Sequence, residues 1–136
     1  MKKILFISVL ILFSGIMSAQ AFQKGNLIGT HVIELKLQPG VTQDQFIQFF
    51  KSKYGPELEK NTGWKAYLVK GVRGENPNSL GLIYVINSEK DRDRFYNPDG
   101  TQSDAGKEMM KKSQGIIDEM SKYATFNTKY TDWIVL

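Results

Sequence analysis

The chain of 136 residues contains no cysteine and only one histidine, His31. The missing cysteine excludes disulfide bonds, thiolate nucleophiles and cysteine-based metal sites, and it leaves no residue for a lipoprotein anchor. A domain of this size folds without disulfides when its core is large enough, and the chain after residue 20 is rich in large apolar side chains. The single histidine raises the question of whether it is a catalytic base or a core residue.

The usual marks of several enzyme classes are also missing. No GxGxxG, P-loop, HExxH or GxSxG motif occurs, so the chain lacks the common signatures of nucleotide binding, zinc proteolysis and α/β-hydrolase chemistry. Asp91, Asp93, Asp99 and Asp104 lie close in sequence, but they lack the spacing and final glutamate of a calcium loop. We interpret them as capping and surface residues, and predict neither a metal nor a cofactor.

Long charged blocks of one sign are absent as well. Positive and negative side chains alternate, as in "SEKDRDRF", which is typical of a solvated helix face. The formal net charge of +4 falls to +2 when Lys2 and Lys3 are set aside. We therefore expect no nucleic-acid partner.

One long hydrophobic run occurs, at the N-terminus. Lys2 and Lys3 precede the apolar residues 4–13, and small residues follow, which predicts a secretory signal peptide over residues 1–20. The alternative is a membrane anchor, but a spanning helix needs about 20 apolar residues. We expect export to the periplasm or beyond, with no membrane association after cleavage.

The cleavage site is left open between two positions, after Ala19 or after Ala21. Residues 21–136 then form a single domain, for which hydrophobic periodicity predicts the elements. Strands are expected over residues 30–37, 64–73, 80–86 and 130–136. Helices are expected from the N-cap Thr42, over residues 89–96 after the N-cap Ser88, and over residues 104–124. Gln45 completes a capping box with Thr42, and Gly55-Pro56 is expected to interrupt the first helix.

The order β-α-β-β-α-β predicts an α+β fold, the ferredoxin-like antiparallel sheet with helices on one face. By the period of two, His31 shares the buried face of its strand with Ile33 and Leu35. The opposite face of the sheet is too apolar to be left in water as one patch. It would carry Val32, Glu34, Tyr67, Val69, Ile83 and Val85. We therefore expect a homodimer with two-fold symmetry.

Two stretches carry a family resemblance: "HVIELKLQPGVTQDQFIQFFKS", with His31 at its start, and "LIYVINSEKDRDRFYNPDG". They resemble the stress-responsive dimeric α/β-barrel proteins. The resemblance covers residues 30–136 and implies a barrel formed by two subunits. The wider superfamily includes antibiotic-biosynthesis and haem-degrading monooxygenases. No histidine lies on a helix here, so the resemblance does not extend to haem ligation.

The plant polyketide-cyclase branch, with olivetolic acid cyclase, is the nearest functional analogue that the resemblance suggests. His31 matches its first-strand histidine, and Tyr54 lies one residue beyond the position of its helix tyrosine. A second histidine of that branch is absent here, where "NPDGT" has Asp99 and Gly100.

Each candidate site residue has two interpretations. His31 is either a general base in an apolar pocket, with its pKa lowered by desolvation, or a hydrogen-bonded core imidazole. Tyr54 and Tyr84 are either proton donors or core residues with satisfied hydroxyls. The candidates for pocket-lining residues are Phe49, Trp64, Tyr96 and Met109.

Three functions remain open on this evidence. The first is binding of a small apolar or aromatic molecule in a pocket between sheet and helices. The second is a cofactor-independent enzyme, a monooxygenase or a cyclase or isomerase, acting on a small aromatic or polyketide-like compound. The third is a structural or protein-interaction role without a pocket.

Overall fold

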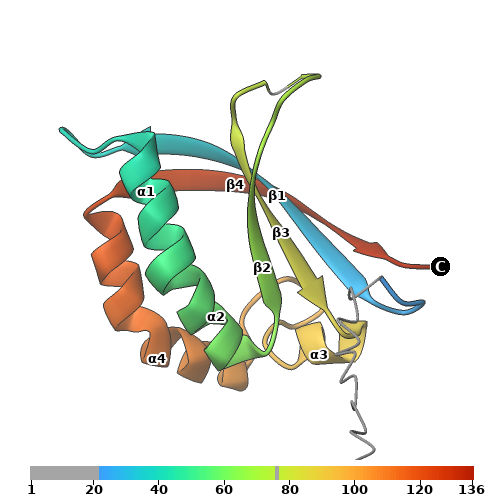
Figure 1. Cartoon of the computed structure of the whole chain (residues 1–136). Helices are drawn as coiled ribbons and strands as arrows, with labels where there is room; N and C mark the ends of the chain where they lie inside the picture. The colour runs from blue at the N-terminus through green and yellow to red at the C-terminus, as the bar shows by residue number, and fades with distance from the viewer. Residues whose placement is uncertain (1–21, 76) are drawn as a thin grey trace, which may run out of the picture.

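An antiparallel sheet of four strands forms one layer of the molecule, and helices cover one of its faces (Figure 1). The computed structural model describes residues 22–75 and 77–136, so the predicted signal peptide lies outside the described residues. The elements are β1 (Leu27–Leu37), α1 (Gln43–Phe49), the π-helical η1 (Phe50–Tyr54), α2 (Gly55–Thr62), β2 (Lys65–Lys70), β3 (Leu80–Ile86), α3 (Glu89–Asp93), α4 (Asp104–Ser121) and β4 (Ala124–Ile134).

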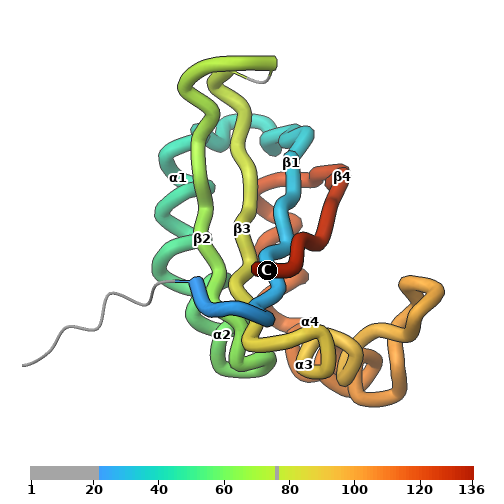
Figure 2. The backbone as a smooth tube through the Cα atoms, turned by 90° about the vertical axis from the view of Figure 1, so that its right-hand side faces the viewer, coloured from blue at the N-terminus to red at the C-terminus, as the bar shows by residue number. Residues whose placement is uncertain are grey.

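The predicted α+β class and antiparallel sheet are confirmed, and the strand order β2-β3-β1-β4 is compatible with a ferredoxin-like fold. The α1–η1–α2 segment and α4 lie on the same side of the sheet, whereas α3 and its connection to α4 lie at the end where α2 finishes (Figures 1 and 2). No helix in the described part of the chain is long and apolar enough to cross a membrane.

The last strand begins earlier than predicted. β4 starts at Ala124 instead of residue 130, and α4 ends at Ser121. Ala124 is buried in the core and pairs with Leu37, and the register continues without a break to the pair of Leu27 with Ile134. The first residues of β4 alternate between inward-facing Ala124 and Phe126 and exposed Thr125 and Asn127, but much of this edge strand lies in water, so the apolar pattern is weak.

The prediction that Gly55-Pro56 interrupts the first helix is wrong. The Thr42 capping box is present, but α1 runs through η1 directly into α2. In η1 the backbone N–H of Gly55 donates to the Phe50 carbonyl, which makes a wider turn than an α-helical one. Pro56 then occupies the first turn of α2, where a missing N–H costs little.

Two smaller differences between the predicted and observed boundaries concern β2 and α3. β2 begins after Trp64, and α3 ends at Asp93, three residues before the predicted boundary. Ser88 caps α3 as predicted, by accepting a hydrogen bond from the Asp91 backbone. The chain leaves helical geometry after α3 and buries Phe95 against Trp64.

The core consists of two clusters between the sheet and the helices. One is built from buried side chains of β1, β3, β4 and the first helix: Ile33, Phe46, Phe50, Leu80, Leu82 and Ala124. The other lies nearer α3: Leu27, Trp64, Ile86, Phe95 and Met109. Tyr84 packs against both clusters, so its ring is held from two sides.

No helix formed by residues 22–75 or 77–136 lies over the outer face of the sheet (Figure 1). Val32, Tyr67 and Val69 on this face are 43%, 52% and 38% exposed. The expected apolar patch is therefore present on the solvent side of the sheet.

The first prediction concerns the core. Phe46 is 1% exposed, so Phe46→Ala should remove about 3–5 kcal/mol from the free energy of unfolding, because the lost contacts leave a cavity. Urea denaturation of both proteins measures the difference. Val72→Ala is the control, since Val72 is 83% exposed and its truncation should change stability little.

Candidate functional site

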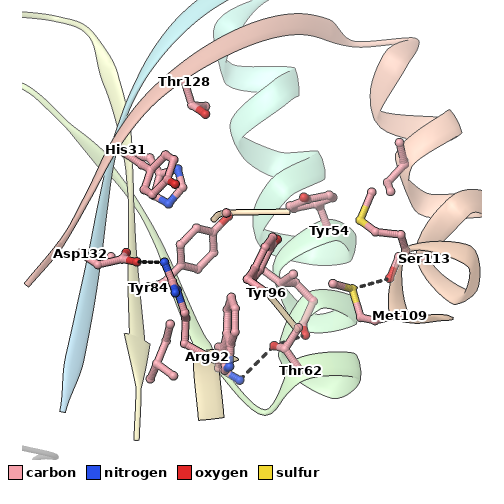
Figure 3. A pocket seen from close by; sticks show the side chains of 18 of the residues that line it. His31, Tyr54, Thr62, Tyr84, Arg92, Tyr96, Met109, Ser113, Thr128 and Asp132 are labelled. Atoms are coloured by element: carbon pink, nitrogen blue, oxygen red, sulfur yellow. Dashed lines mark hydrogen bonds and ion pairs between the residues drawn. The ribbon is translucent and has the colours of Figure 1, made fainter. Parts of the chain in front are cut away.

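A cavity of about 320 Å³ lies between the sheet and the helices α2 and α4 (Figure 3). Residues from every layer of the fold line it. They are Gly29, His31, Tyr54, Leu58, Thr62, Trp64, Tyr84, Ile86, Arg92, Tyr96, Gly100, Met109, Met110, Ser113, Ile116, Ile117, Thr128, Tyr130 and Asp132.

The cavity wall has an apolar and a polar part. The helices supply most of the apolar part, through Leu58 of α2 and four side chains of α4, namely Met109, Met110, Ile116 and Ile117. The polar part comes mainly from the sheet and from α3, and includes His31, Arg92 and Asp132. A molecule that fills this space would therefore meet hydrocarbon on one side and hydrogen-bonding groups on the other.

His31 reaches the cavity because of strand alternation in β1. It lies directly opposite Tyr130 of β4 and Leu82 of β3, on the face that the helices cover. Its ring contacts two aromatic side chains. Tyr84 meets it edge-on at a centroid distance of 5.0 Å, and Tyr130 stacks on it at 5.5 Å with an interplanar angle of 22°.

The protonation of His31 follows from this environment. Burial lowers the pKa of His31, and the Asp132 carboxylate offsets part of that effect. No side chain or backbone group of the described residues makes a hydrogen bond to its imidazole. The ring is thus neutral at pH 7 and its acceptor nitrogen is free, which is the state a general base requires.

Four tyrosines line the same space (Figure 3). Tyr130 is 56% exposed, whereas Tyr54, Tyr84 and Tyr96 lie further inside the fold. Burial raises the pKa of Tyr54, of Tyr84 most strongly, and of Tyr96. These hydroxyls therefore stay protonated at neutral pH and can donate hydrogen bonds. None of the three has a hydrogen-bond partner among residues 22–75 and 77–136.

The π turn decides where Tyr54 points. Tyr54 is the last residue of η1, and a π turn takes up one more residue than an α turn. The additional residue rotates the side chains that follow it around the helix axis. Tyr54 consequently lines the cavity, although its place in the sequence is one residue beyond that expected from the family resemblance.

An ion pair joins α3 to β4 at the polar part of the wall. Arg92 Nη2 lies 3.3 Å from Asp132 Oδ2 (Figure 3), and Arg92 Nη1 lies 3.1 Å from Asp93 Oδ1. Burial opposes the charge on Arg92, but the two carboxylates outweigh it and raise the pKa of Arg92. The positive and negative charges in the wall therefore balance.

Gly29 makes room for this ion pair. Gly29 pairs with Tyr84 on one side and Asp132 on the other, and a Cβ there would lie 3.1 Å from Asp132 Oδ1. A side chain at position 29 would force the Asp132 carboxylate, which pairs with Arg92, to shift by a few tenths of an ångström.

Six of the seven predicted site residues line the cavity: His31, Tyr54, Tyr84, Trp64, Tyr96 and Met109. The expectation for Phe49 is not met. Phe49 is 3% exposed and stacks on Tyr123 at a centroid distance of 4.5 Å, in the packing between α1 and the end of α4. Phe49 precedes the π turn, so it faces the core instead of the cavity.

Sequence reasoning missed Arg92, Gly100, Tyr130 and Asp132. Arg92 lies in a charged stretch whose alternating signs are typical of a solvated helix face, and nothing local distinguishes it from its neighbours. Tyr130 and Asp132 carried a usable signal. They are spaced by two in a strand, so both face the same side as Phe126 and Ala124.

Within the described residues, no three histidine, cysteine, aspartate or glutamate side chains converge as a metal site would require. No model of a protein family matches the chain, and no curated protein is significantly similar to it. The family resemblance therefore stays a prediction, and the site is interpreted from its own geometry.

The second prediction concerns the charge on His31. Because this chain has one histidine, NMR titration of its imidazole reports one pKa, expected below the ordinary value of about 6.5. Asp132→Asn removes the attraction that favours the imidazolium, so it should lower this pKa further. Asp44→Asn, in the first turn of α1, should leave it unchanged, and a rise with Asp132→Asn would contradict the assigned electrostatics.

Proposed function

We propose that this protein binds a small aromatic or polyketide-like molecule in the cavity beside His31. The observation that carries the proposal is the convergence of unpaired polar groups on one cavity. The His31 imidazole and the hydroxyls of Tyr54, Tyr84 and Tyr96 face it, with no partner among the described residues. Polar groups inside a protein normally have hydrogen-bond partners, so a bound molecule or solvent in the cavity would complete these accessible ones.

The size and lining of the cavity support the same class of ligand. A volume of about 320 Å³ lies at the lower end of the range for small-molecule sites. Aromatic walls favour stacking with flat rings, and the methionines of α4 adapt to ligands of different shape. Because the ionised groups in the wall balance, a ligand without net charge fits best.

A cofactor-independent enzyme is the second candidate, and the neutral imidazole favours it. His31 would take a proton from the bound molecule, and Tyr54 or Tyr84 would donate one to a carbonyl or enolate oxygen. The raised pKa values of both tyrosines keep that proton in place until the oxygen gains negative charge. The third candidate, a structural role without a pocket, has no comparable support from these contacts.

In this proposal the exported protein acts as a homodimer, and its two subunits form an α/β barrel. The support for the dimer is the apolar outer face of the sheet, where Val32, Tyr67 and Val69 are exposed. Two copies packed through this face would remove it from water. Export rests on the pattern of residues 1–20 alone.

The third prediction tests ligand binding. Mass spectrometry of protein purified from its native envelope should find a retained small aromatic compound. With 1-naphthol as the probe, Tyr84→Phe should weaken binding by about 1 kcal/mol, roughly a fivefold rise in Kd, because one hydrogen bond is lost. Tyr67→Phe is the matched control, since Tyr67 lies on the outer face of the sheet. Equal Kd values for both variants would count against the proposed site.

The retained compound also distinguishes a binding protein from an enzyme. Conversion of the retained compound by the wild-type protein, and binding without conversion by His31→Gln, would assign catalysis to His31. Binding without conversion by both proteins would leave the binding function alone.

The fourth prediction tests the dimer. Sedimentation at tens of micromolar should give twice the monomer mass for the wild type. Val32→Lys, in the middle of the outer face, should give a monomer, because two buried lysines would lose their hydration without a partner. Val72→Lys is the control, since Val72 lies in the connection between β2 and β3. A wild-type monomer would refute the dimer.

A further inference from the structure

We infer that Tyr130 is a gate: its ring controls access to His31, and small molecules enter the cavity between Tyr130 and Gly100. The inference rests on the proposed function, because a gate matters only when a molecule enters. In this role Tyr130 determines which molecules reach His31 and how fast they do so.

The two aromatic rings that contact His31 differ in how firmly they are held. Tyr84 lies in the inner strand β3 and packs against both core clusters. Tyr130 lies in the edge strand β4, is 56% exposed, and packs against neither cluster. Of the two, only Tyr130 has room to turn away from the imidazole without disturbing the core.

Little holds the Tyr130 side chain in its present position. Its hydroxyl has no hydrogen-bond partner in the described parts of the chain, and the one ring contact it makes there is the stack on His31. An exposed aromatic stack is a weak interaction. A flat ligand can stack on His31 in place of Tyr130. The new stack offsets the contact that is lost when the Tyr130 ring turns away.

The wall opposite Tyr130 is built from backbone. Gly100 lines the cavity, and a Cβ on it would lie 3.7 Å from Tyr130 Oη. Its φ of +81° belongs to the left-handed region that glycine adopts easily. Hydrogen bonds hold this loop: the Asn97 N–H donates to the Thr101 carbonyl, and Asp99 accepts from the Thr101 N–H and hydroxyl.

The strand itself is anchored beside the gate. Asp132, two residues after Tyr130 on the same face, pairs with Arg92, and β4 is hydrogen-bonded to β1 along its length. The backbone of β4 is therefore fixed on both sides of Tyr130. Opening consists of rotation of one side chain, and the loop with Gly100 serves as the rigid frame.

The single histidine allows a direct test that needs no knowledge of the natural ligand. Diethyl pyrocarbonate modifies neutral imidazole, so its rate, followed by ultraviolet absorbance, reports access to His31 alone. The rate is taken from the high-pH plateau, where His31 is neutral in every variant.

Tyr130→Ala should speed the modification severalfold, and Tyr130→Phe should leave it unchanged because the ring remains. Gly100→Asn should slow it, since asparagine tolerates a positive φ and narrows the entrance. Tyr67→Ala is the control, as a comparably exposed tyrosine on the other face of the sheet. Equal rates for Tyr130→Ala and Tyr67→Ala would overturn the gate.

A second experiment tests the gate and the proposed ligand class independently of each other. Saturating 1-naphthol should protect wild-type His31 from modification and should bind and leave faster in Tyr130→Ala. Faster modification in Tyr130→Ala without any protection by 1-naphthol would support the gate and count against the proposed ligand class. Protection with equal rates in both proteins would support the ligand class and refute the gate.

Discussion

The antiparallel pairing of β1 with β4 is the constraint on which the site depends. The two strands are each eleven residues long and are paired from end to end. This register sets Tyr130 opposite His31 and Asp132 opposite Gly29. A shift of one residue would turn Tyr130 and Asp132 to the outer face, and the imidazole would lose both its stacking partner and its nearby carboxylate.

The cavity keeps its polar groups in the protonation states that suit proton exchange. Burial acts in opposite directions on its two kinds of group: it favours the neutral imidazole of His31 and the neutral phenols of Tyr54, Tyr84 and Tyr96. Arg92 is the exception: the ion pair with Asp132 and the carboxylate of Asp93 outweigh burial and raise the pKa of Arg92. Besides its ion pair, the wall therefore presents a neutral imidazole and the neutral phenols of its buried tyrosines.

The helical side of the cavity depends on a local irregularity. If α1 continued as a regular α-helix, Tyr54 would be rotated away from its present direction by about one residue, which is 100°. The π turn before Pro56 removes that offset and lets the helix continue past the proline. One feature of the backbone thus places a site residue and also extends the layer that covers the sheet.

Local patterns sufficed for the α+β class, the exact extent of β3, the caps at Thr42 and Ser88, and the orientation of His31 toward the helices. They failed where the outcome depends on a distant partner. The start of β4 follows from pairing with β1, and the continuity of the helix at Pro56 follows from a π turn that no composition rule indicates.

For the site, the sequence by itself determined which residue types were available: one histidine, several tyrosines and no cysteine. Alternation within a strand was enough to direct His31 and Tyr84 inward, because side-chain direction there is a local property. Only the tertiary structure decided that Arg92 meets Asp132 and that Tyr130 covers His31 opposite Gly100. These contacts join residues far apart in the chain, and their geometry exists only once the sheet has formed.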